Sequence, residues 1–356
     1  MAAVTNRNRD FRDAQRRKRD EFYTSMSVIE DELQHYTRHF YGKTVYCNCD
    51  DPRESNFFRY FAQNFEALGL KRLISTCYRS QNPDVFHSAS RDSNSAAYID
   101  YTGTPGAREL GMEHLEISSL EGDGDFRSAE SIDLLRHADI IVTNPPFSLF
   151  REYVTQLIEH EKHFLILGNM NAVTYREVFA QFQGDNIWYG PSIRSGDREF
   201  RVPDDYPLNA AGSRVDDKGV KYIRVKGVRW FTNLDFDGRK TELALTRRYD
   251  PLSFPKYANF DAIEVGKTRD IPMDYSGLMG VPISFIDHYT PDQFEIVGSS
   301  RTLGSPMSEI APKGTYSPGG PRFYLPNGDG TYRRMYDRIV IRHRRRGNLY
   351  EKSKGV

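Results

Sequence analysis

Hydrophobic and polar positions form two kinds of pattern along the chain, one typical of strands and one typical of helices. The two patterns alternate regularly from about residue 43 to residue 190. Apolar runs of strand length, such as KTVYCNCD, KRLISTCY, DIIVTN and HFLILGNMNAV, are separated by segments with helical spacing, such as FFRYFAQNFEALGL, AESIDLLRHA and SLFREYVTQLIEHE. Strands that alternate with helices in this way pair in parallel, because each crossover helix returns the chain to the same end of the sheet. The sequence therefore predicts an α/β fold with a doubly wound sheet.

The regions before and after this alternation have other patterns. A polar, basic lead is followed by the amphipathic segment TSMSVIEDELQHYTRHF, for which Thr24 is the expected N-cap. Beyond residue 190, KYIRVKGVRWFTNL and KTELALTRRYD predict antiparallel strands. Residues 251–356 are rich in Pro, Gly and Tyr and have no long helical stretch. We therefore predict three parts, residues 1–42, 43–250 and a β-rich C-terminal region over 251–356.

Composition changes this picture mainly through the distribution of charge. The 356 residues have a formal net charge of zero, which excludes a globally basic nucleic-acid binder. Basic residues are concentrated in two runs. There are seven basic and two acidic residues from Arg7 to Arg19, and seven arginines with one aspartate from Arg333 to Arg346. Each run is either a solvated tail or a local contact for phosphate groups.

The cysteines and the hydropathy of the chain indicate the cellular compartment. Cys47, Cys49 and Cys77 have neither a disulfide framework nor a metal-ligand spacing, so we expect buried structural thiols and no metal site. No apolar run approaches the ~18–20 residues that a membrane span needs. The polar N-terminus shows no signal peptide. These features predict a cytoplasmic protein without a membrane partner.

The segment Asn144-Pro145-Pro146-Phe147 carries the strongest chemical signal. It follows a hydrophobic strand directly, and two consecutive prolines make a rigid loop. The Asn144 side-chain oxygen and the Pro145 carbonyl can each accept one hydrogen from an –NH₂ group, and Phe147 can stack on the ring that bears it. Two such acceptors orient the nitrogen lone pair and stabilise the positive charge that develops as the nitrogen attacks an electrophile. The loop therefore indicates group transfer to a planar amine.

Two other segments suit a shared cofactor pocket. Asp50-Asp51-Pro52 follows the first strand of the alternation, where backbone N–H groups at a helix start and a carboxylate can hold the amino-acid end of a zwitterionic cofactor. Asp125 and Phe126 precede the helix AESIDLLRHA, where a carboxylate beside a ring can bind an adenine. Taken alone, each segment is also compatible with an ordinary capping turn.

Together these residues resemble the EcoRI-type family of adenine-specific DNA methyltransferases. The similarity covers nearly the whole chain and includes DEFYT (20–24), CNCDDPRESNFFRYF (47–61), DFRS (125–128), NPPFSLFREY (144–153), KYANFDAIEV (256–265) and DIPMDYSGLMGVPISFIDHYTPDQFEIVG (270–298).

The resemblance implies an adenine N6-methyltransferase with a Rossmann-like core, which takes a methyl group from S-adenosylmethionine and acts on an adenine flipped out of double-stranded DNA. Residues 1–42 then contribute to the cofactor pocket, 43–250 form the catalytic domain, and 251–356 contact and recognise DNA. A separately acting restriction endonuclease is a candidate partner.

The cofactor residues are expected to be Phe22, Tyr23, Thr24, Asp50, Asp51, Pro52, Asp125 and Phe126, and the catalytic residues Asn144, Pro145, Pro146 and Phe147. For phosphate contacts, the basic runs predict Arg338, Arg342, Arg344, Arg345 and Arg346 first, and Arg16 and Arg17 second.

Two alternatives stay open at this point. Another planar amine, in cytosine, RNA adenine or a protein glutamine, is a chemically equivalent acceptor, although Phe147 in place of Tyr and the long C-terminal similarity favour DNA adenine. A catalytically silent DNA-binding relative is the second alternative, and the intact NPPF segment argues against it.

Overall fold

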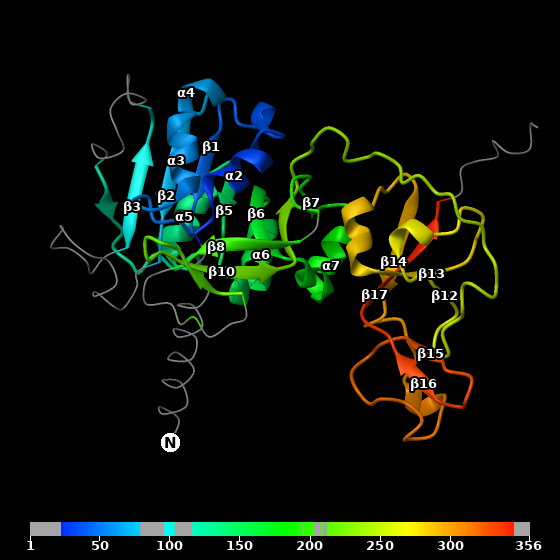
Figure 1. The fold of residues 1–356 in the computed structure, drawn as a ribbon. Coiled ribbons are helices and arrows are strands. Elements are labelled where there is room, and N and C mark those ends of the chain that lie inside the picture. Colours follow the sequence, from blue (N-terminus) through cyan, green and yellow to red (C-terminus); the bar gives the residue numbers. More distant parts are fainter. Residues whose placement is uncertain are drawn as a thin grey trace, which may run out of the picture. The chain divides into compact units, whose positions relative to one another are not determined.

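The computed structural model describes residues 23–78, 96–103, 116–194, 196–202, 208 and 212–344 (Figure 1). The chain divides into two compact units. The first is Met1–Ala172 with Ile187–Phe236, and the second is Val173–Asn186 with Asp237–Val356. The second unit thus begins before residue 251, where the sequence pattern placed the change, and it includes a helix from the middle of the chain.

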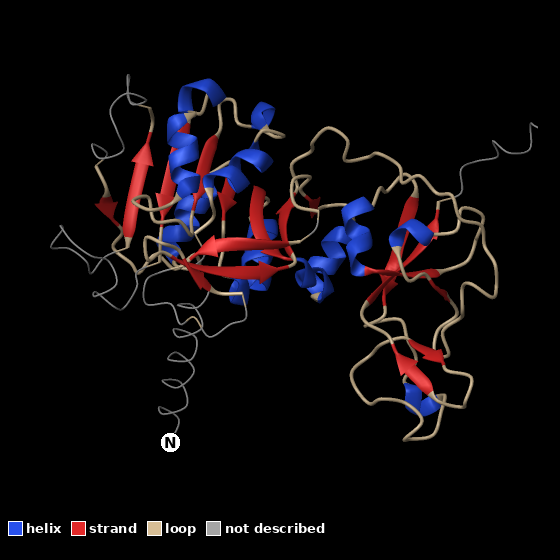
Figure 2. Ribbon diagram, in the orientation of Figure 1, coloured by secondary structure: helices blue, strands red, loops and turns tan. Residues whose placement is uncertain are grey.

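A mixed sheet of eight strands forms the centre of the first unit (Figure 2). Its order is β4-β3-β2-β1-β5-β6-β11-β7, in which β2, β1, β5 and β6 run parallel and the outer strands pair in antiparallel fashion. This arrangement confirms the predicted α/β class. The strands are β1 (Thr44–Cys47), β2 (Arg72–Thr76), β3 (Ala97–Tyr101), β4 (Ser118–Ser119), β5 (Ile140–Thr143), β6 (His163–Asn169), β7 (Trp188–Tyr189) and β11 (Val228–Thr232).

Helices cover both faces of the central strands, which explains why these strands are apolar throughout. Every residue of β1 and β5 is buried. Val45 and Cys47 belong to a core cluster with residues of α2 (Met26–Leu33) and α3 (Asn56–Gln63). Tyr46 lies on the opposite face, because side chains alternate along a strand, and its hydroxyl interacts with Ser131 of α5 (Ala129–His137). Helix α6 (Phe150–Glu159) contacts β6.

The helix ends follow from local capping chemistry. Ser55 caps α3, since its hydroxyl accepts the N–H of Phe57 at 3.0 Å, and Ser128 caps α5 in the same way. The helical segment after α3 continues as α4 (Phe65–Leu68) and ends at Gly69 with a left-handed φ of 60°, as its sequence predicts. The expectation that Thr24 caps the first helix is wrong. Helix α2 begins one residue later, after an extended Ser25.

A separate three-stranded sheet completes the described part of the first unit. It consists of β8 (Asp197–Arg201), β9 (Arg214–Val215) and β10 (Lys221–Lys226), with β10 in the centre. Strands β10 and β11 follow each other in the segment for which the sequence predicted antiparallel strands. Strand β11 pairs antiparallel with β6, with Trp230 opposite Leu167.

The second unit contains helix α7 (Arg176–Gln183), a four-stranded sheet and a hairpin. The sheet order is β12-β13-β17-β14. Its strands are β12 (Ile263–Glu264), β13 (Met279–Pro282), β14 (Phe294–Ser299) and β17 (Arg338–His343), and the hairpin strands are β15 (Tyr324–Pro326) and β16 (Tyr332–Arg334). Short 3-10 turns, η6 (Thr268–Asp270), η7 (Ile283–His288) and η8 (Met307–Glu309), connect these strands.

One predicted strand is wrong. Residues 240–250, KTELALTRRYD, form no strand, although all of them are described. The backbone groups of Leu243 bond instead to the side chain of Gln293, whose amide oxygen and nitrogen lie 2.8 Å from the Leu243 nitrogen and oxygen. A side chain therefore satisfies the polar groups that a neighbouring strand would otherwise bind. Among the described residues, none of the helices has the length and apolar character needed to span a membrane.

Candidate active site

The loops after β1 and β5 meet at one end of the sheet, because these strands are parallel neighbours with Val45 opposite Ile140. The buried carboxyl group of Asp50 joins them. Its Oδ1 accepts the Ser55 hydroxyl at 2.9 Å and its Oδ2 accepts the Thr143 hydroxyl. The Asn144 backbone contributes a further hydrogen bond to this carboxyl. Asp50 therefore attaches the start of the NPPF segment to the first-strand loop.

Burial makes the Asp50 carboxyl unusual. Loss of solvation raises its pKa to about 7, against the opposing effect of the hydrogen bonds from Thr143, Ser55 and the Asn144 backbone. The backbone of Asp50 is held as well, since its N–H donates to Thr76 and its carbonyl accepts the Ser75 hydroxyl at 2.7 Å. With both carboxyl oxygens occupied, this residue positions the site and leaves ligand contacts to its neighbours.

The NPPF segment has the rigid geometry that its prolines predict. Asn144 is buried, with 9% of its surface exposed. Pro146 has φ −56° and ψ 121°, and its carbonyl accepts the N–H of Leu149 at 3.0 Å. This bond starts the short 3-10 turn η4 (Phe147–Leu149), which continues directly into α6. Phe147 packs against the core of the unit. The loop is thus anchored by β5 on one side and by a helix on the other.

The Asp125 carboxylate is oriented by an arginine that the sequence reasoning missed. Nε and Nη2 of Arg127 lie 2.9 and 2.8 Å from Oδ1 and Oδ2 of Asp125, and the Arg127 N–H also donates to Oδ1. Nη1 of Arg127 reaches Glu152 of α6 at 3.1 Å. Residues 125–127, the DFR turn, are therefore attached to the helix that follows the NPPF segment.

A second connection runs through the interior. The ring of Phe126 lies edge-to-face on Tyr153 of α6, with 5.1 Å between centroids. The Tyr153 hydroxyl donates to Oδ1 of Asn48, directly after β1. Nδ2 of Asn48 is buried and makes no hydrogen bond within the described part of the chain. The three loops predicted from the sequence, after β1, before α5 and after β5, are thus brought together around α6.

Asn48 and Tyr153 were not identified as site residues from the sequence. Asn48 did carry a signal, as a polar residue between two cysteines in an otherwise apolar strand. Tyr153 carried none, since it occupies an ordinary apolar position of an amphipathic helix.

The segment Tyr23–Thr24 lies beside the first-strand loop. The Thr24 carbonyl accepts Nδ2 of Asn56, the first residue of α3, at 2.7 Å. The Tyr23 N–H donates to the carbonyl of Arg201, at the end of β8. Oγ1 of Thr24 is buried and has no hydrogen-bond partner among the residues described. Phe22, the third expected residue of this segment, lies outside the described residues.

Asp51 and Pro52 form the turn that leads into α3. Oδ1 of Asp51 accepts the N–H of Arg53 at 2.9 Å, and its carbonyl accepts the N–H of Ser55 at 2.7 Å. This is the capping turn that was the alternative interpretation from the sequence. It leaves the Asp51 side chain at the edge of the same site, 11% exposed.

The described residues contain no group of His, Cys, Asp and Glu side chains suited to a metal ion. Within the described part of the chain, Cys47, Cys49 and Cys77 form no disulfide bond. Cys47 is buried, whereas Cys49 and Cys77 are half-buried. The Cys49 thiol lies in the site, close to Thr143 and Tyr153, and burial raises its pKa. A protonated thiol at this position is a poor nucleophile and a poor metal ligand.

The arginines expected to contact phosphates have different environments. Arg338 is buried and forms a bidentate pair with Glu264, with Nη2 2.7 Å from Oε1, so it is not available for DNA. Arg342 pairs with Glu295 at the surface, and Arg344 is exposed. The remaining expected contacts, Arg345, Arg346, Arg16 and Arg17, lie outside the described residues.

Comparisons with known proteins identify a family to which the chain is similar. A family model described as "Adenine-specific methyltransferase EcoRI" matches residues 10–344. The chain is 50% identical over 286 residues to the type II methyltransferase M.EcoRI of Escherichia coli, which covers 80% of this chain and 87% of that protein. It is 38% identical over 291 residues to the type II methyltransferase M.MgeORF184P of Mycoplasma genitalium, covering 81% and 85%. It is 35% identical over 345 residues to the type II methyltransferase M.MpnI of Mycoplasma pneumoniae, covering 94% and 98%. No solved structure matches the chain.

Proposed function

This chain belongs to the EcoRI-type family of adenine-specific methyltransferases, and on that premise we propose how its site carries out the reaction. The chain methylates adenine in DNA, and its relatives indicate a restriction–modification setting. We propose that its core is Rossmann-like, that its methyl donor is S-adenosylmethionine, and that its substrate is double-stranded DNA. The observation that carries the proposal is the meeting of the NPPF segment, the first-strand loop and the DFR turn at one end of parallel strands.

The residues at this end of the sheet suit S-adenosylmethionine. Nδ2 of Asn48 and Oγ1 of Thr24 are buried without a hydrogen-bond partner in the part of the chain that is described, as is typical where a polar ligand completes the network. When bound, the cofactor supplies an electrophilic methyl group. We propose that it is held by the residues expected from the sequence, with two changes. Asn48 is added, and Asp50 is left out because its carboxyl oxygens already accept hydrogen bonds from Ser55 and Thr143. The proposed residues are Phe22, Tyr23, Thr24, Asn48, Asp51, Pro52, Asp125 and Phe126.

Arg127 determines how the Asp125 carboxylate can take part in cofactor binding. Its guanidinium holds the carboxylate in one orientation through two parallel hydrogen bonds. An ionised carboxylate has about four acceptor directions, so this pairing is compatible with an additional donor such as an adenine amine. Phe126, already fixed against Tyr153, supplies the adjoining ring.

In this proposal, the NPPF segment binds the acceptor adenine. The Asn144 side-chain oxygen and the Pro145 carbonyl accept the two amine hydrogens and stabilise the charge that develops on nitrogen, while Phe147 stacks on the base. No general base is required, since the methylated ammonium is acidic and loses its proton to water. Asp50 acts as a positioning residue, because it holds the backbone at the start of this segment.

The test is incubation of the purified protein with S-adenosylmethionine and double-stranded DNA, followed by mass spectrometry of the nucleosides. N6-methyladenine supports the proposal. Methylated cytosine would overturn it, as would transfer only to RNA or to protein when these acceptors are supplied in parallel incubations. Binding of S-adenosylmethionine in a calorimeter without any transfer would identify a catalytically silent relative. The cytoplasmic location and the separately acting endonuclease remain predictions from the sequence.

A further inference from the structure

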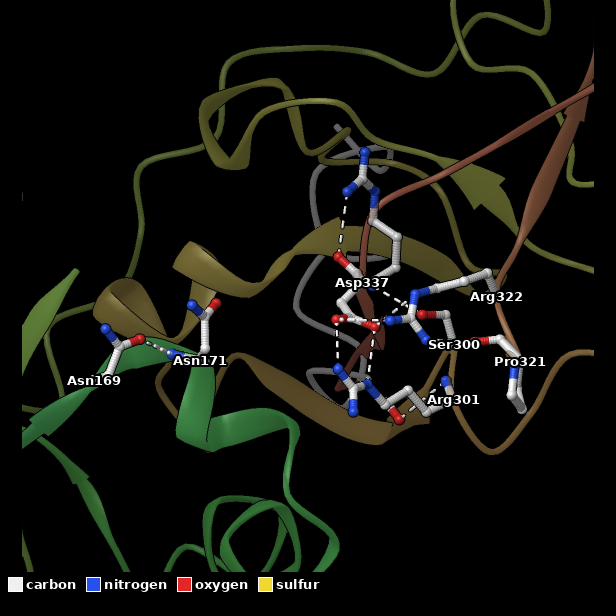
Figure 3. Close-up of polar contacts among 9 residues, drawn as sticks. Asn169, Asn171, Ser300, Arg301, Pro321, Arg322 and Asp337 are labelled. Atoms are coloured by element: carbon white, nitrogen blue, oxygen red, sulfur yellow. Dashed lines mark hydrogen bonds and ion pairs between the residues drawn. The ribbon is translucent and has the colours of Figure 1, made fainter. Parts of the chain in front are cut away.

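A cluster of arginines surrounds a single carboxylate in the second unit (Figure 3). Nε and Nη2 of Arg301 lie 3.1 and 3.0 Å from Oδ1 and Oδ2 of Asp337. Nε and Nη2 of Arg322 lie 3.0 and 3.3 Å from the same two oxygens. Arg301 follows β14, Arg322 precedes β15 and Asp337 precedes β17, so three separate segments converge here.

A third arginine joins this cluster. Arg334, the last residue of β16, lies against Gly319 so closely that a Cβ atom on that glycine would be 2.5 Å from the guanidinium carbon. Its Nε is buried and has no hydrogen-bond partner within the described residues. Burial lowers the pKa of the Arg322 guanidinium, and the positive charges of Arg301 and Arg334 lower it further. Two guanidinium groups thus share the Asp337 carboxylate, and the charge of Arg334 acts on one of them, Arg322, so positive charge remains in excess.

The surrounding chain segment is also basic. Residues 300–344 contain eight lysines and arginines and only three acidic residues, in a protein whose net charge is zero. Tyr336, between Arg334 and Asp337, is 88% exposed. An exposed aromatic ring next to arginines in the chain suits a duplex backbone, because the arginines can contact phosphates and the ring can contact a sugar.

We propose that Arg301, Arg322 and Arg334, together with the ring of Tyr336, form a contact site for the phosphate backbone of double-stranded DNA. The inference rests on the proposed function. It assigns DNA contacts to Arg301 and Arg322, which lie outside the basic runs, and to Arg334, which lies in the second run but was not among the predicted contacts. It also replaces Arg338, whose guanidinium is committed to Glu264. Asp337 holds Arg301 and Arg322 in place and offsets part of their mutual repulsion, and phosphates would supply the additional negative charge.

Arg301→Gln/Arg334→Gln removes two of the three cations. Binding of a labelled random-sequence duplex to the full chain is followed by fluorescence anisotropy over a series of salt concentrations. Each lost phosphate contact should lower the slope of log K against log salt by about 0.9, so the double variant should lose nearly twice that amount. Arg247→Gln is the matched control, because Arg247 is an exposed arginine of the same unit that pairs with one carboxylate, Asp270. Its slope should equal that of the unmodified chain.

Two further variants test the proposal in other directions. Asp337→Asn removes the negative charge and should strengthen duplex binding at low salt. Tyr336→Ala should weaken binding equally at all salt concentrations without changing the slope, because it removes a contact that carries no charge. Circular dichroism and Tm establish that each variant is folded.

Different results would contradict the DNA-contact site and the proposed function. If the unmodified chain methylates and binds DNA while all these variants keep its affinity and slope, the cluster is no DNA contact and an acidic protein surface becomes its alternative partner. If the unmodified chain neither binds duplex DNA nor methylates it, the proposed function itself is wrong.

Discussion

The Asp50 carboxyl accepts a hydrogen bond from the Thr143 hydroxyl, which joins the loop that follows β1 to the last residue of β5. Both groups are buried. Thr143 directly precedes Asn144, so this contact sets the position at which the NPPF segment leaves the sheet. A displacement of about 1 Å at a reacting group can cost on the order of 10² in rate, so this contact is relevant to catalysis although it touches no substrate.

Replacement of Asn144 should stop methyl transfer and preserve cofactor binding. Asn144→Ala removes an acceptor for the amine and for the developing charge, and such losses cost about 10²–10³ in rate. Single-turnover transfer and calorimetric binding of S-adenosylmethionine measure the two effects separately. Asn186→Ala, at an exposed asparagine of the second unit, is the control. Full turnover by the Asn144 variant would remove this residue from the mechanism.

Two buried carboxyls should make stability depend on pH. Burial raises the pKa of Asp50 and of Glu32 to about 7 from ordinary values near 4. Each folded-state pKa lies above its unfolded value, so the folded chain binds more protons between about pH 4 and pH 7. The free energy of unfolding should therefore fall as the pH rises through that range.

Variants of these two carboxyls distinguish their roles. Glu32→Gln and Asp50→Asn should each flatten this dependence, as measured by denaturant titration at several pH values. Glu32 binds Tyr36 and Ser192, outside the proposed catalytic loop, so only the Asp50 variant should also lower the rate of transfer. Equal transfer rates in both variants would show that Asp50 has no positioning role.

Loss of Asp125 or Tyr23 should weaken S-adenosylmethionine binding. Asp125→Ala removes the carboxylate that Arg127 orients, and Tyr23→Ala removes the ring over which the Arg201 guanidinium lies. Removal of one charged hydrogen-bonding partner corresponds to about 1.5–3 kcal/mol, or roughly ten- to hundredfold in Kd. Asp100→Ala is the matched control for the first variant, since Asp100 forms a similar bidentate pair with Arg72 on neighbouring strands. Unchanged Kd values for both site variants would mean that the pocket lies elsewhere.

The target adenine should leave the helical stack when the protein binds. The adenine amine can reach Asn144 and Phe147 only when its base has left the stack, and extrusion of a base costs a few kcal/mol. A fluorescent adenine analogue at the target position should brighten on binding to Phe147→Ala and remain dimmer with the unmodified chain, where the ring stacks on the base. Identical emission from free and bound duplex would contradict flipping.

The sequence predicted those parts of the site that depend on local order. Two prolines after an apolar strand produce a rigid loop in any context, and parallel strands bring their carboxyl ends together by topology. The contacts within the site depend on residues far apart in the chain. Tyr153 and Asn48 are an example, because neither position has a sequence pattern that names the other as its partner.

The errors have the same origin. Arg338 belongs to a basic run, and only the folded chain shows that Glu264, 74 residues away, neutralises it in the interior. The strand expected at residues 240–250 has suitable alternation, but the amide of Gln293 takes the place of a neighbouring strand. Charge and periodicity are local properties, whereas burial and pairing are set by the tertiary fold.

The position of β1 between β2 and β5 has a consequence for the order of folding. Strand β2 follows β1 after the two short helices α3 and α4, whereas the pairing of Val45 with Ile140 must close a loop of almost a hundred residues. Closure of such a loop requires a large loss of chain entropy before any contact forms, so non-local strand pairs form slowly. The β1–α3–β2 unit can therefore assemble first, and the NPPF segment reaches its final geometry only when β5 docks. During refolding, competence for methyl transfer should appear after most of the helical signal has returned.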